Sequence, residues 1–510
     1  MIYLNISTIQ MFSRNNKHSE KIMMKRYQQV TLAVFVSCFS TQVVSQEHHY
    51  WSKQFGSRSA LMSGAVVGGV RDTSAGFYNP GALGFIKAST FSASGNGYQL
   101  ESVDISNGVG TGEDVDSLET NIVPLLISGT VMLGNNTFGY SILAKNQSSI
   151  KMSGRHEKSA FDLLSSNPDY FVGIDPSTDE PIFGGRFDGT EEYKGQFTYD
   201  SKVNEIWGGL SWAHLLHENI SVGISGFLAL RKQSFNVVQF ARVTNPESKW
   251  IASEDAFQNA DFYNVRGLLK FGLAGDFGAL KLGATLTTPS VSFFGTGTVA
   301  GGYGQFKEDE ARGILADDHQ DDLDAKYKTP LSLALGLEYA INQKTSVAGT
   351  IEWFAKQKSY DVITPNSKNW LVGGGEMFLD TQELKVEDKA DSVVNFAVAV
   401  EQVFINKITG YLSFSTDFSS FPGGSYNSMG INDWDIYHLT VGLTRQSKAS
   451  SFALGFTYSF GSQDDFERLA YINPTDRRGD DYILAMNDEG KASADYRAFG
   501  IIVGYTYFFK

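Results

Sequence analysis

The sequence predicts an all-β fold: a transmembrane antiparallel β-barrel of about 14 strands with an N-terminal hatch, or plug, inside its lumen. Three observations predict this fold class. Apolar residues alternate with small or polar ones over many segments, short turns alternate with long polar stretches between those segments, and a Gly- and Ala-rich segment precedes the first strand. We therefore divide the chain into an upstream extension with a signal peptide (1–46), the hatch (47–85) and the barrel with long extracellular loops (86–510).

The composition excludes several other classes. Of the 510 residues, 42% are hydrophobic and 19% charged, with 52 Gly and one Cys, which is too apolar for a disordered chain. A single Cys rules out a disulfide scaffold or a Cys-based metal site. The formal charge of -14 argues against a nucleic-acid partner, which would require a basic face. Beyond the N-terminus no apolar run approaches the roughly 18 residues of a membrane helix.

The N-terminus has the pattern of a secretory signal peptide. Lys25 and Arg26 precede the apolar run 30–36, and small or polar residues follow as far as Gln46, near which we expect cleavage. Cys38 lies within the segment to be removed, and we interpret it as an apolar residue of that segment rather than a lipoprotein cysteine. Three methionines are candidate starts of translation: Met1, Met23 and Met24.

Period-two alternation defines the predicted strands. From 331 to 339 the odd positions carry Leu or Tyr and the even positions carry Ser, Ala, Gly or Glu. The same pattern occurs at 220–230, 452–460 and 497–509. A strand with one apolar face and one face of small residues is typical of a barrel wall between lipid and lumen.

The connections between these strands support a membrane barrel over a soluble sandwich. In outer-membrane barrels, short turns lie at one rim and long loops at the other. Short turns are predicted near 134–136, 217–219, 276–278, 342–344, 405–407 and 446–448. Long polar stretches are predicted at 99–121, 151–195, 234–261, 290–329, 357–391, 419–435 and 462–496.

The segment before the first strand is suited to fill the lumen, and small lumen-facing residues such as Gly223 and Gly455 would leave room for it. Its residue order resembles the N-terminal hatch of the FadL-type outer-membrane transporters of long-chain fatty acids and aromatic hydrocarbons. The family has an Asn-Pro-Ala motif where this chain has Asn-Pro-Gly. The residues that carry the resemblance, and that it implies as hatch or gate residues, are Arg58, Gly64, Gly69, Asp72, Asn79, Pro80 and Gly81.

The resemblance implies a passive function. In this family the hatch is thought to shift so that an apolar ligand can leave through a lateral gap in the barrel wall. We accordingly expect a hydrophobic small-molecule ligand, contacts with outer-membrane lipid and lipopolysaccharide, assembly by the barrel-assembly machinery, and a monomer in the outer membrane of a Gram-negative bacterium. No enzymatic activity, cofactor or metal is expected.

Two groups of polar residues were weighed as chemical sites. His48 and His49 form an adjacent pair, but no further ligands lie nearby, and we interpret them as exposed histidines without a metal. The acidic stretch 308–324 lacks the Gly and Glu of a twelve-residue calcium loop. We interpret it as a solvated outer loop, and bridging of divalent ions stays open.

The main functional hypothesis is a channel for uptake of small hydrophobic compounds such as long-chain fatty acids. The alternative is a porin-like or structural surface barrel whose acidic loops bind partners. A hydrophilic porin would carry rows of charge on its lumen face, whereas the predicted inward positions here are mostly Ser, Thr, Gly and Ala.

Overall fold

A computed structural model gives the fold of most of the chain. It describes residues 48–161, 171–174, 181–183, 189–307, 314–367, 369–372, 377–380, 384–405, 407–422, 431, 433–474 and 490–509. The predicted signal peptide (1–46) lies outside the described residues. No helix among them is long and apolar enough to cross a bilayer.

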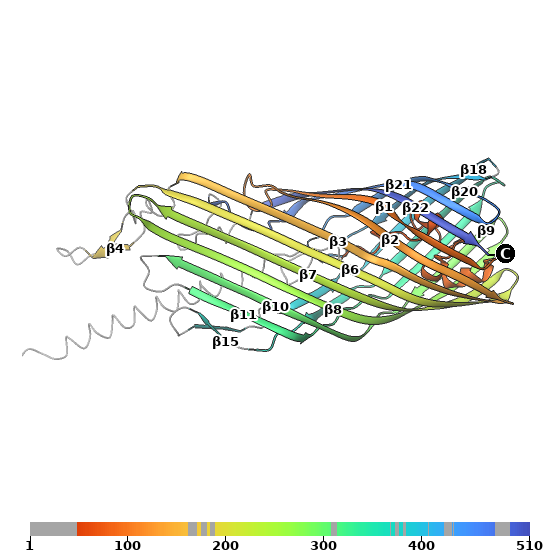
Figure 1. Cartoon of the computed structure of the whole chain (residues 1–510), viewed down its shortest axis with the longest axis horizontal. Helices are drawn as coiled ribbons and strands as arrows, with labels where there is room; N and C mark the ends of the chain where they lie inside the picture. The colour runs from red at the N-terminus through yellow and green to blue at the C-terminus, as the bar shows by residue number, and fades with distance from the viewer. Residues whose placement is uncertain are drawn as a thin grey trace, which may run out of the picture.

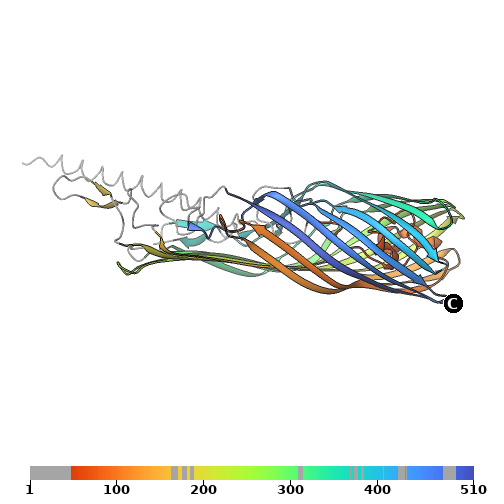
Figure 2. The same cartoon turned by 90° about the horizontal axis from the view of Figure 1, so that it is seen from above.

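The described chain forms a closed antiparallel barrel (Figures 1 and 2). One sheet of 16 strands contains it, and the pairing of β8 with β9 closes a ring of 14 of them. In order around the ring, the strands are β1 (Thr90–Ser106), β2 (Val115–Leu133), β3 (Asn136–Phe161), β6 (Glu191–His217), β7 (Ile220–Asn245), β8 (Trp250–Phe277), β9 (Leu280–Thr287), β12 (Ser332–Ala340), β13 (Thr345–Phe354), β18 (Val393–Ile405), β19 (Ile408–Asp417), β20 (Ile436–Gln446), β21 (Ser450–Glu467) and β22 (Lys491–Phe508). This arrangement confirms the predicted all-β fold with a 14-stranded antiparallel barrel.

The remaining elements extend the barrel or lie inside it. Beyond the ring, β10 (Val291–Lys307) pairs with β8 and β11 (Ile314–Asp324) pairs with β10. Three small sheets pair β4 (Phe171–Ile174) with β5 (Pro181–Phe183), β14 (Gln357–Ile363) with β17 (Val386–Ala390), and β15 (Asn369–Val372) with β16 (Met377–Asp380). The short helices are α2 (Ser57–Leu61), α3 (Ala75–Tyr78) and the 3-10 helix η2 (Pro80–Phe85).

The two ends of the barrel differ. All six predicted short turns fall between consecutive strands, such as β6 and β7, at the end that also holds the C-terminus (Figure 1). We call this the turn end, and the opposite end the loop end. Four neighbouring strands, β3, β6, β7 and β8, have 26 to 28 residues, whereas β12 and β13 have 9 and 10. Nine to eleven residues suffice to span a bilayer, so the four long strands extend well beyond it.

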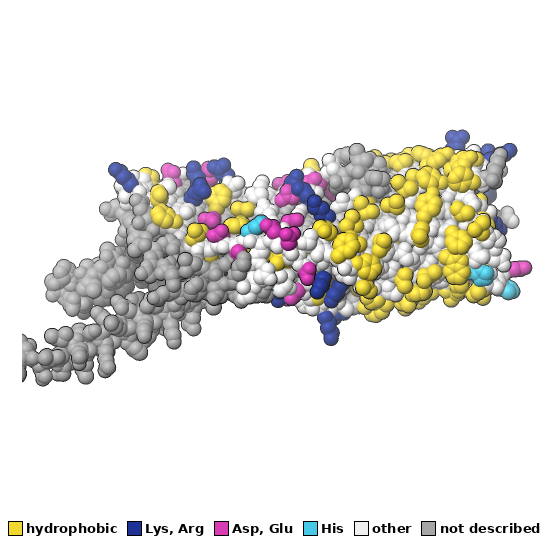
Figure 3. Space-filling view, turned by 60° about the horizontal axis from the view of Figure 1, so that its bottom comes forward, with side chains coloured by type: hydrophobic (Ala, Val, Ile, Leu, Met, Phe, Trp, Pro, Cys, Tyr) yellow, Lys and Arg dark blue, Asp and Glu magenta, His cyan; other side chains and the backbone are white. Residues whose placement is uncertain are grey.

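An apolar band marks the membrane-spanning part. On β6 and β7, the outward side chains of Leu210 and Leu228 are 73% and 58% exposed. Figure 3 shows hydrophobic side chains covering the turn half of one face, whereas charged side chains lie over the loop half. On β7 the outward apolar set ends at Leu230 and the next outward residue is Lys232. The turn half is therefore the part that faces lipid.

The predicted loop at 234–261 is wrong, because β7 continues to Asn245 and β8 begins at Trp250. Above Lys232 the alternation persists with its polarity inverted: the inward residues Phe235 and Val237 are now the apolar ones. In the lipid-facing part the apolar face points outward, but beyond the membrane it points into a protein core. The prediction at 290–329 is corrected in the same way, since β10 and β11 occupy most of it.

Apolar residues fill the interior in two separate clusters. The cluster of the loop half packs strand residues against loop residues, among them Phe235, Trp434, Leu469 and Ile472. The cluster of the turn half is built around the N-terminal segment, residues 48–85, with Leu61 and Leu83 fully buried. This segment lies within the barrel near its turn end, where Figure 1 draws it in red. It is the stretch for which the sequence predicted a hatch.

Candidate functional site

The N-terminal segment is held in a compact shape by Asp72. Its carboxylate accepts hydrogen bonds from the backbone N–H groups of Arg58 (3.1 Å), Ser59 (3.3 Å) and Ser74 (3.0 Å). Two of these donors belong to the first turn of α2, where backbone N–H groups lack partners within the helix. Gly64 follows α2 with φ of 79°, a left-handed conformation that favours glycine. Two of the predicted hatch residues thus have local structural roles.

Asn79 joins the segment to the wall. Its Oδ1 accepts from the Gly81 N–H at 3.0 Å, while its Nδ2 donates to the carbonyl of Val67 at 2.9 Å and to that of Leu273 on β8 at 3.0 Å. Pro80 starts η2, a position where its missing N–H costs no hydrogen bond. The Asn-Pro-Gly turn therefore connects two parts of the segment with one strand.

Bare backbone on the wall allows this close approach. A Cβ atom at any of four inward glycines would collide with atoms of the segment. These are Gly223 on β7, Gly272 on β8, Gly283 on β9 and Gly336 on β12. Gly81 in the segment is restricted in the same way, because a Cβ on it would lie 2.8 Å from the carbonyl oxygen of Gly272.

Ion pairs also join the segment to the wall. Arg58 donates from Nη2 to Glu338 on β12 at 2.9 Å, from Nε to Glu401 on β18 at 2.7 Å and from Nη1 to the carbonyl of Gly69 at 3.1 Å. Arg71 also pairs with Glu338, whose side chain is only 2% exposed. We call Arg58, Arg71, Glu338 and Glu401 the segment–wall cluster. Sequence reasoning identified Arg58 but missed both acids, although Glu338 stands out as a charge on a predicted lumen face.

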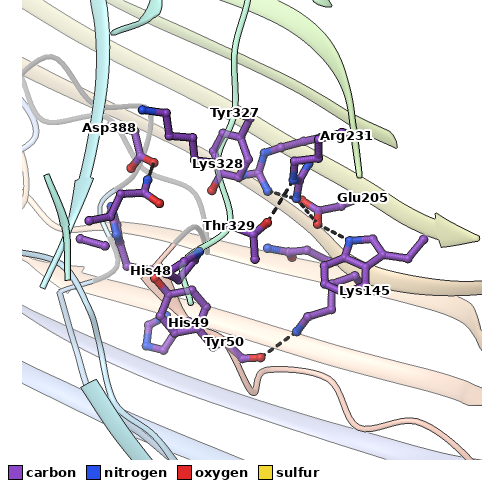
Figure 4. A pocket seen from close by; sticks show the side chains of 16 residues that line it. His48, His49, Tyr50, Lys145, Glu205, Arg231, Tyr327, Lys328, Thr329 and Asp388 are labelled. Atoms are coloured by element: carbon purple, nitrogen blue, oxygen red, sulfur yellow. Dashed lines mark hydrogen bonds and ion pairs between the residues drawn. The ribbon is translucent and has the colours of Figure 1, made fainter. Parts of the chain in front are cut away.

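A second group of charges lies nearer the loop end and belongs to the wall alone. Glu205 on β6 pairs with Arg231 on β7 at 2.7 Å and with Arg266 on β8 at 2.5 Å. The Tyr327 ring lies 4.0 Å from the Arg231 guanidinium and 4.9 Å from that of Arg266, as cation–π contacts (Figure 4). We call Glu205, Arg231 and Arg266 the wall cluster.

Two neighbouring cavities lie between the segment and the long strands. The outer one, about 540 Å³ of space partly open to solvent, is lined by the wall cluster and by His48, His49 and Lys145 (Figure 4). The inner one comprises about 670 Å³ of space that includes open solvent, and its lining contains aromatic and lysine side chains. The cavities share five lining residues: Tyr50, Lys145, Trp207, Thr329 and Pro330. We treat them together as the chamber.

The inner cavity combines an apolar wall with cations. Tyr50 stacks on Phe354 at 4.2 Å, and Phe77 lies 4.5 Å from the Lys270 Nζ and 5.9 Å from the Lys145 Nζ. Lys145 donates to the Tyr50 carbonyl at 2.7 Å. Within the described residues, Lys270 makes no ion pair, although only 6% of it is exposed. Such a cation suits an acidic group on an otherwise apolar molecule.

The exposed His pair expected from the sequence is wrong, because His48 and His49 are 2% and 4% exposed. His49 Nε2 donates to the Trp434 carbonyl at 2.9 Å, and the His48 ring packs edge-on against Phe421. Burial lowers the pKa of His48 to about 3 and that of His49 to about 4, so both rings are neutral at neutral pH. Among the residues that the structure describes, no group of three His, Cys, Asp or Glu side chains could hold a metal ion.

The wall beside the chamber is incompletely paired. The β2–β3 ladder runs from Leu133 and Asn136 to Leu126 and Leu143, while both strands continue towards the loop end. Nearer the loop end, the backbone N–H of Lys151 on β3 donates to the side-chain Oγ of Ser117 on β2 at 3.0 Å. Lys145 lies at a bulge of β3 in this interval and lines the chamber. A gap in the ladder therefore lies next to the chamber.

Comparison with known proteins finds structures with a similar fold but low sequence identity. No protein-family model and no curated protein matches the sequence. The fold is similar to that of the Pseudomonas putida toluene transporter TodX, with a TM-score of 0.53 and 14% identity over 89% of this chain and 99% of TodX. The Ralstonia pickettii toluene transporter TbuX gives 0.51 and 14% over 90% and 99%, and a Pseudomonas aeruginosa FadL homologue 0.50 and 13% over 91% and 100%. The predicted resemblance to FadL-type barrels is thus confirmed for the fold.

Proposed function

We propose that this chain is a passive outer-membrane channel for hydrophobic compounds with an acidic head group, long-chain fatty acids being the class that fits best. The observation that carries the proposal is the chamber, in which aromatic side chains surround a buried lysine without an ion pair. The inner cavity has three lysines, Lys53, Lys145 and Lys270, against one carboxylate, Glu352. This excess of positive charge favours an anionic ligand over a neutral one.

The route through the protein follows from the elements around the chamber. The N-terminal segment acts as the hatch that blocks the lumen towards the turn end, with its predicted gate residues at the contact with the wall. The gap between β2 and β3 gives the ligand a lateral exit into the apolar membrane. The outer-membrane location rests on the apolar band and on the named function of similar barrels, which are transporters.

A second candidate is uptake of neutral aromatic hydrocarbons. The aromatic lining of the inner cavity and the fold shared with the two toluene transporters favour it. The two candidates differ in one requirement, because a neutral ring does not need the Lys270 ammonium group.

Binding to the purified barrel in detergent micelles tests the proposal. Lys270→Met should weaken displacement of a fluorescent fatty acid by palmitate about 10- to 100-fold, the loss of one charge-assisted hydrogen bond of about 1.5–3 kcal/mol. Lys232→Met, which removes an exposed outward lysine, is the matched control and should bind as the native protein. Equal affinity of native and Lys270→Met protein for palmitate would contradict the acidic-ligand assignment, and toluene binding by both would favour the second candidate.

A further inference from the structure

The N-terminal segment separates two compartments of the lumen. Trp51, Lys53 and Gln54 line the inner cavity of the chamber on one side and, on the other, a second cavity of about 520 Å³ of space that includes open solvent. The latter lies against β1 and β20 to β22. Its lining includes the polar side chains of Ser63, Gln99, His438, Thr440, Thr457 and Ser459 beside apolar ones such as Ala60 and Ile502. We call it the polar compartment.

The lining of the polar compartment is suited to hold water. Ser63 Oγ lies 2.8 Å from Ser413 Oγ and 3.0 Å from Thr440 Oγ1, which in turn lies 3.1 Å from Thr457 Oγ1. His438 Nδ1 bonds Ser459 Oγ at 2.7 Å, while its Nε2 has no partner among the described residues although only 8% of the residue is exposed. Buried polar atoms without protein partners commonly bind ordered water.

A larger space, partly open to solvent, lies on the other side of the segment, at the turn end. This vestibule of about 1750 Å³ has charged and hydroxyl side chains in its lining. They include Ser57, Arg58, Arg71, Glu401, Thr444 and Thr506. On β20, Thr440 faces the polar compartment and Thr444 the vestibule, so only the inward position of Gly442 separates the two spaces along that strand.

One apolar side chain occupies that position. Leu61, the last residue of α2, is fully buried. Its Cδ2 rests on the bare backbone of Gly442 on β20 and Gly455 on β21, where a Cβ atom at either glycine would collide with it. The side chain thus fits a notch that two glycines leave in the wall. A hydrophobic constriction between two hydrated spaces stops water and ions by dewetting.

From this geometry we infer that the barrel contains a second, hydrophilic route, for water and small ions, between α2 and strands β20 and β21. Leu61 in its glycine notch is the seal of this route. When the side chain leaves the notch, the polar compartment becomes continuous with the vestibule. The route is separate from the chamber and its apolar ligand, and its class of solute is set by the hydroxyl lining.

Ion currents through the full-length barrel in planar lipid bilayers test the inference. Leu61→Ala should raise the potassium chloride current per barrel about tenfold or more, because the dewetted constriction is widened. Leu61→Met, which conserves volume, should return the current to the native level. Leu83→Ala is the matched control: Leu83 is an equally buried leucine of the segment that lies beside Gly139 of β3, away from the notch.

The outcomes separate the inference from a general loosening of the segment. A raised current in Leu61→Ala with a native current in Leu83→Ala supports a seal at Leu61. A native current in a folded Leu61→Ala barrel, or equal currents in both variants, overturns it. If Leu61→Ala does not assemble, as judged by heat-modifiable migration, Leu61→Val is read by the same criteria because it removes one methylene from the notch.

Discussion

The two charge clusters of the lumen use the same chemistry for different purposes. In the segment–wall cluster the arginines come from the N-terminal segment, and their acids lie on β12 and β18, 280 and 343 residues away. In the wall cluster all three residues lie on neighbouring strands of the barrel. Both clusters contain a nearly buried glutamate that neutralises two arginines. Only the first can hold or release a separate part of the chain.

This difference indicates what each cluster contributes. Removing one partner of a buried ion pair leaves an uncompensated charge, at a cost of about 3–5 kcal/mol. In the wall cluster the loss of a partner lowers the stability of the barrel and changes the shape of the chamber. In the segment–wall cluster the segment can avoid the cost by moving, which exposes the arginines to water.

The largest effect is expected from deleting most of the N-terminal segment, which carries the arginines of the segment–wall cluster. Deletion of residues 56–81 should open a pore that passes sugars, because a barrel of this strand number encloses a wide lumen unless something fills it. Liposome swelling in sugar solutions measures the pore, and heat-modifiable migration confirms that the barrel has assembled. Unchanged permeability of the assembled deletion variant would show that the segment does not block the lumen.

A pair of matched glutamine variants tests the comparison directly. Glu338→Gln should release the segment and expose Arg58 and Arg71 to trypsin, since both arginines lose their shared carboxylate. Glu205→Gln removes the shared carboxylate of the wall cluster and should lower the thermal stability of the barrel while the segment stays protected. Limited proteolysis measures the exposure of the segment, and thermal unfolding measures the stability of the barrel. Equal cleavage of the segment in both variants would contradict the distinction.

The fold was predictable because large apolar residues alternate with small or polar ones along the membrane strands. The six short turns and the antiparallel ring followed from that signal. Strands of the loop half were predicted as loops. From Phe235 onward the apolar residues point inward, so the outward positions no longer show the apolar pattern of a membrane strand. Continued alternation with inverted polarity was the available signal.

The candidate site was predictable only in part. The residues of the N-terminal segment were found by resemblance, and Asn79 and Arg58 do contact the wall. Their partners lie far along the chain, at sequence separations of 194 residues for Asn79 and 343 for Arg58. No local pattern reveals such pairs. The chamber lysines were missed because single lysines in alternating strands do not differ from surface ones.

The smallest effect is expected from the close packing of Gly81 against the wall. Gly81→Ala should destabilise the seating of the segment by about 1–3 kcal/mol, because the new methyl group meets the Gly272 carbonyl. Gly208→Ala is the control, since a Cβ at this glycine meets nothing within 4 Å. Chemical denaturation followed by tryptophan fluorescence should show a loss of stability in the first variant alone. Equal stabilities would mean that the close packing at Asn79–Gly81 is not a constraint.

The central claim is that the barrel admits acidic apolar molecules and excludes sugars. Its most direct measurement compares, in the same liposomes with the native full-length barrel, the uptake of a labelled long-chain fatty acid with the permeation of sugars. The account predicts uptake of the fatty acid above that of protein-free liposomes, together with no sugar permeation. Sugar permeation without fatty-acid uptake would contradict it and favour a porin-like barrel.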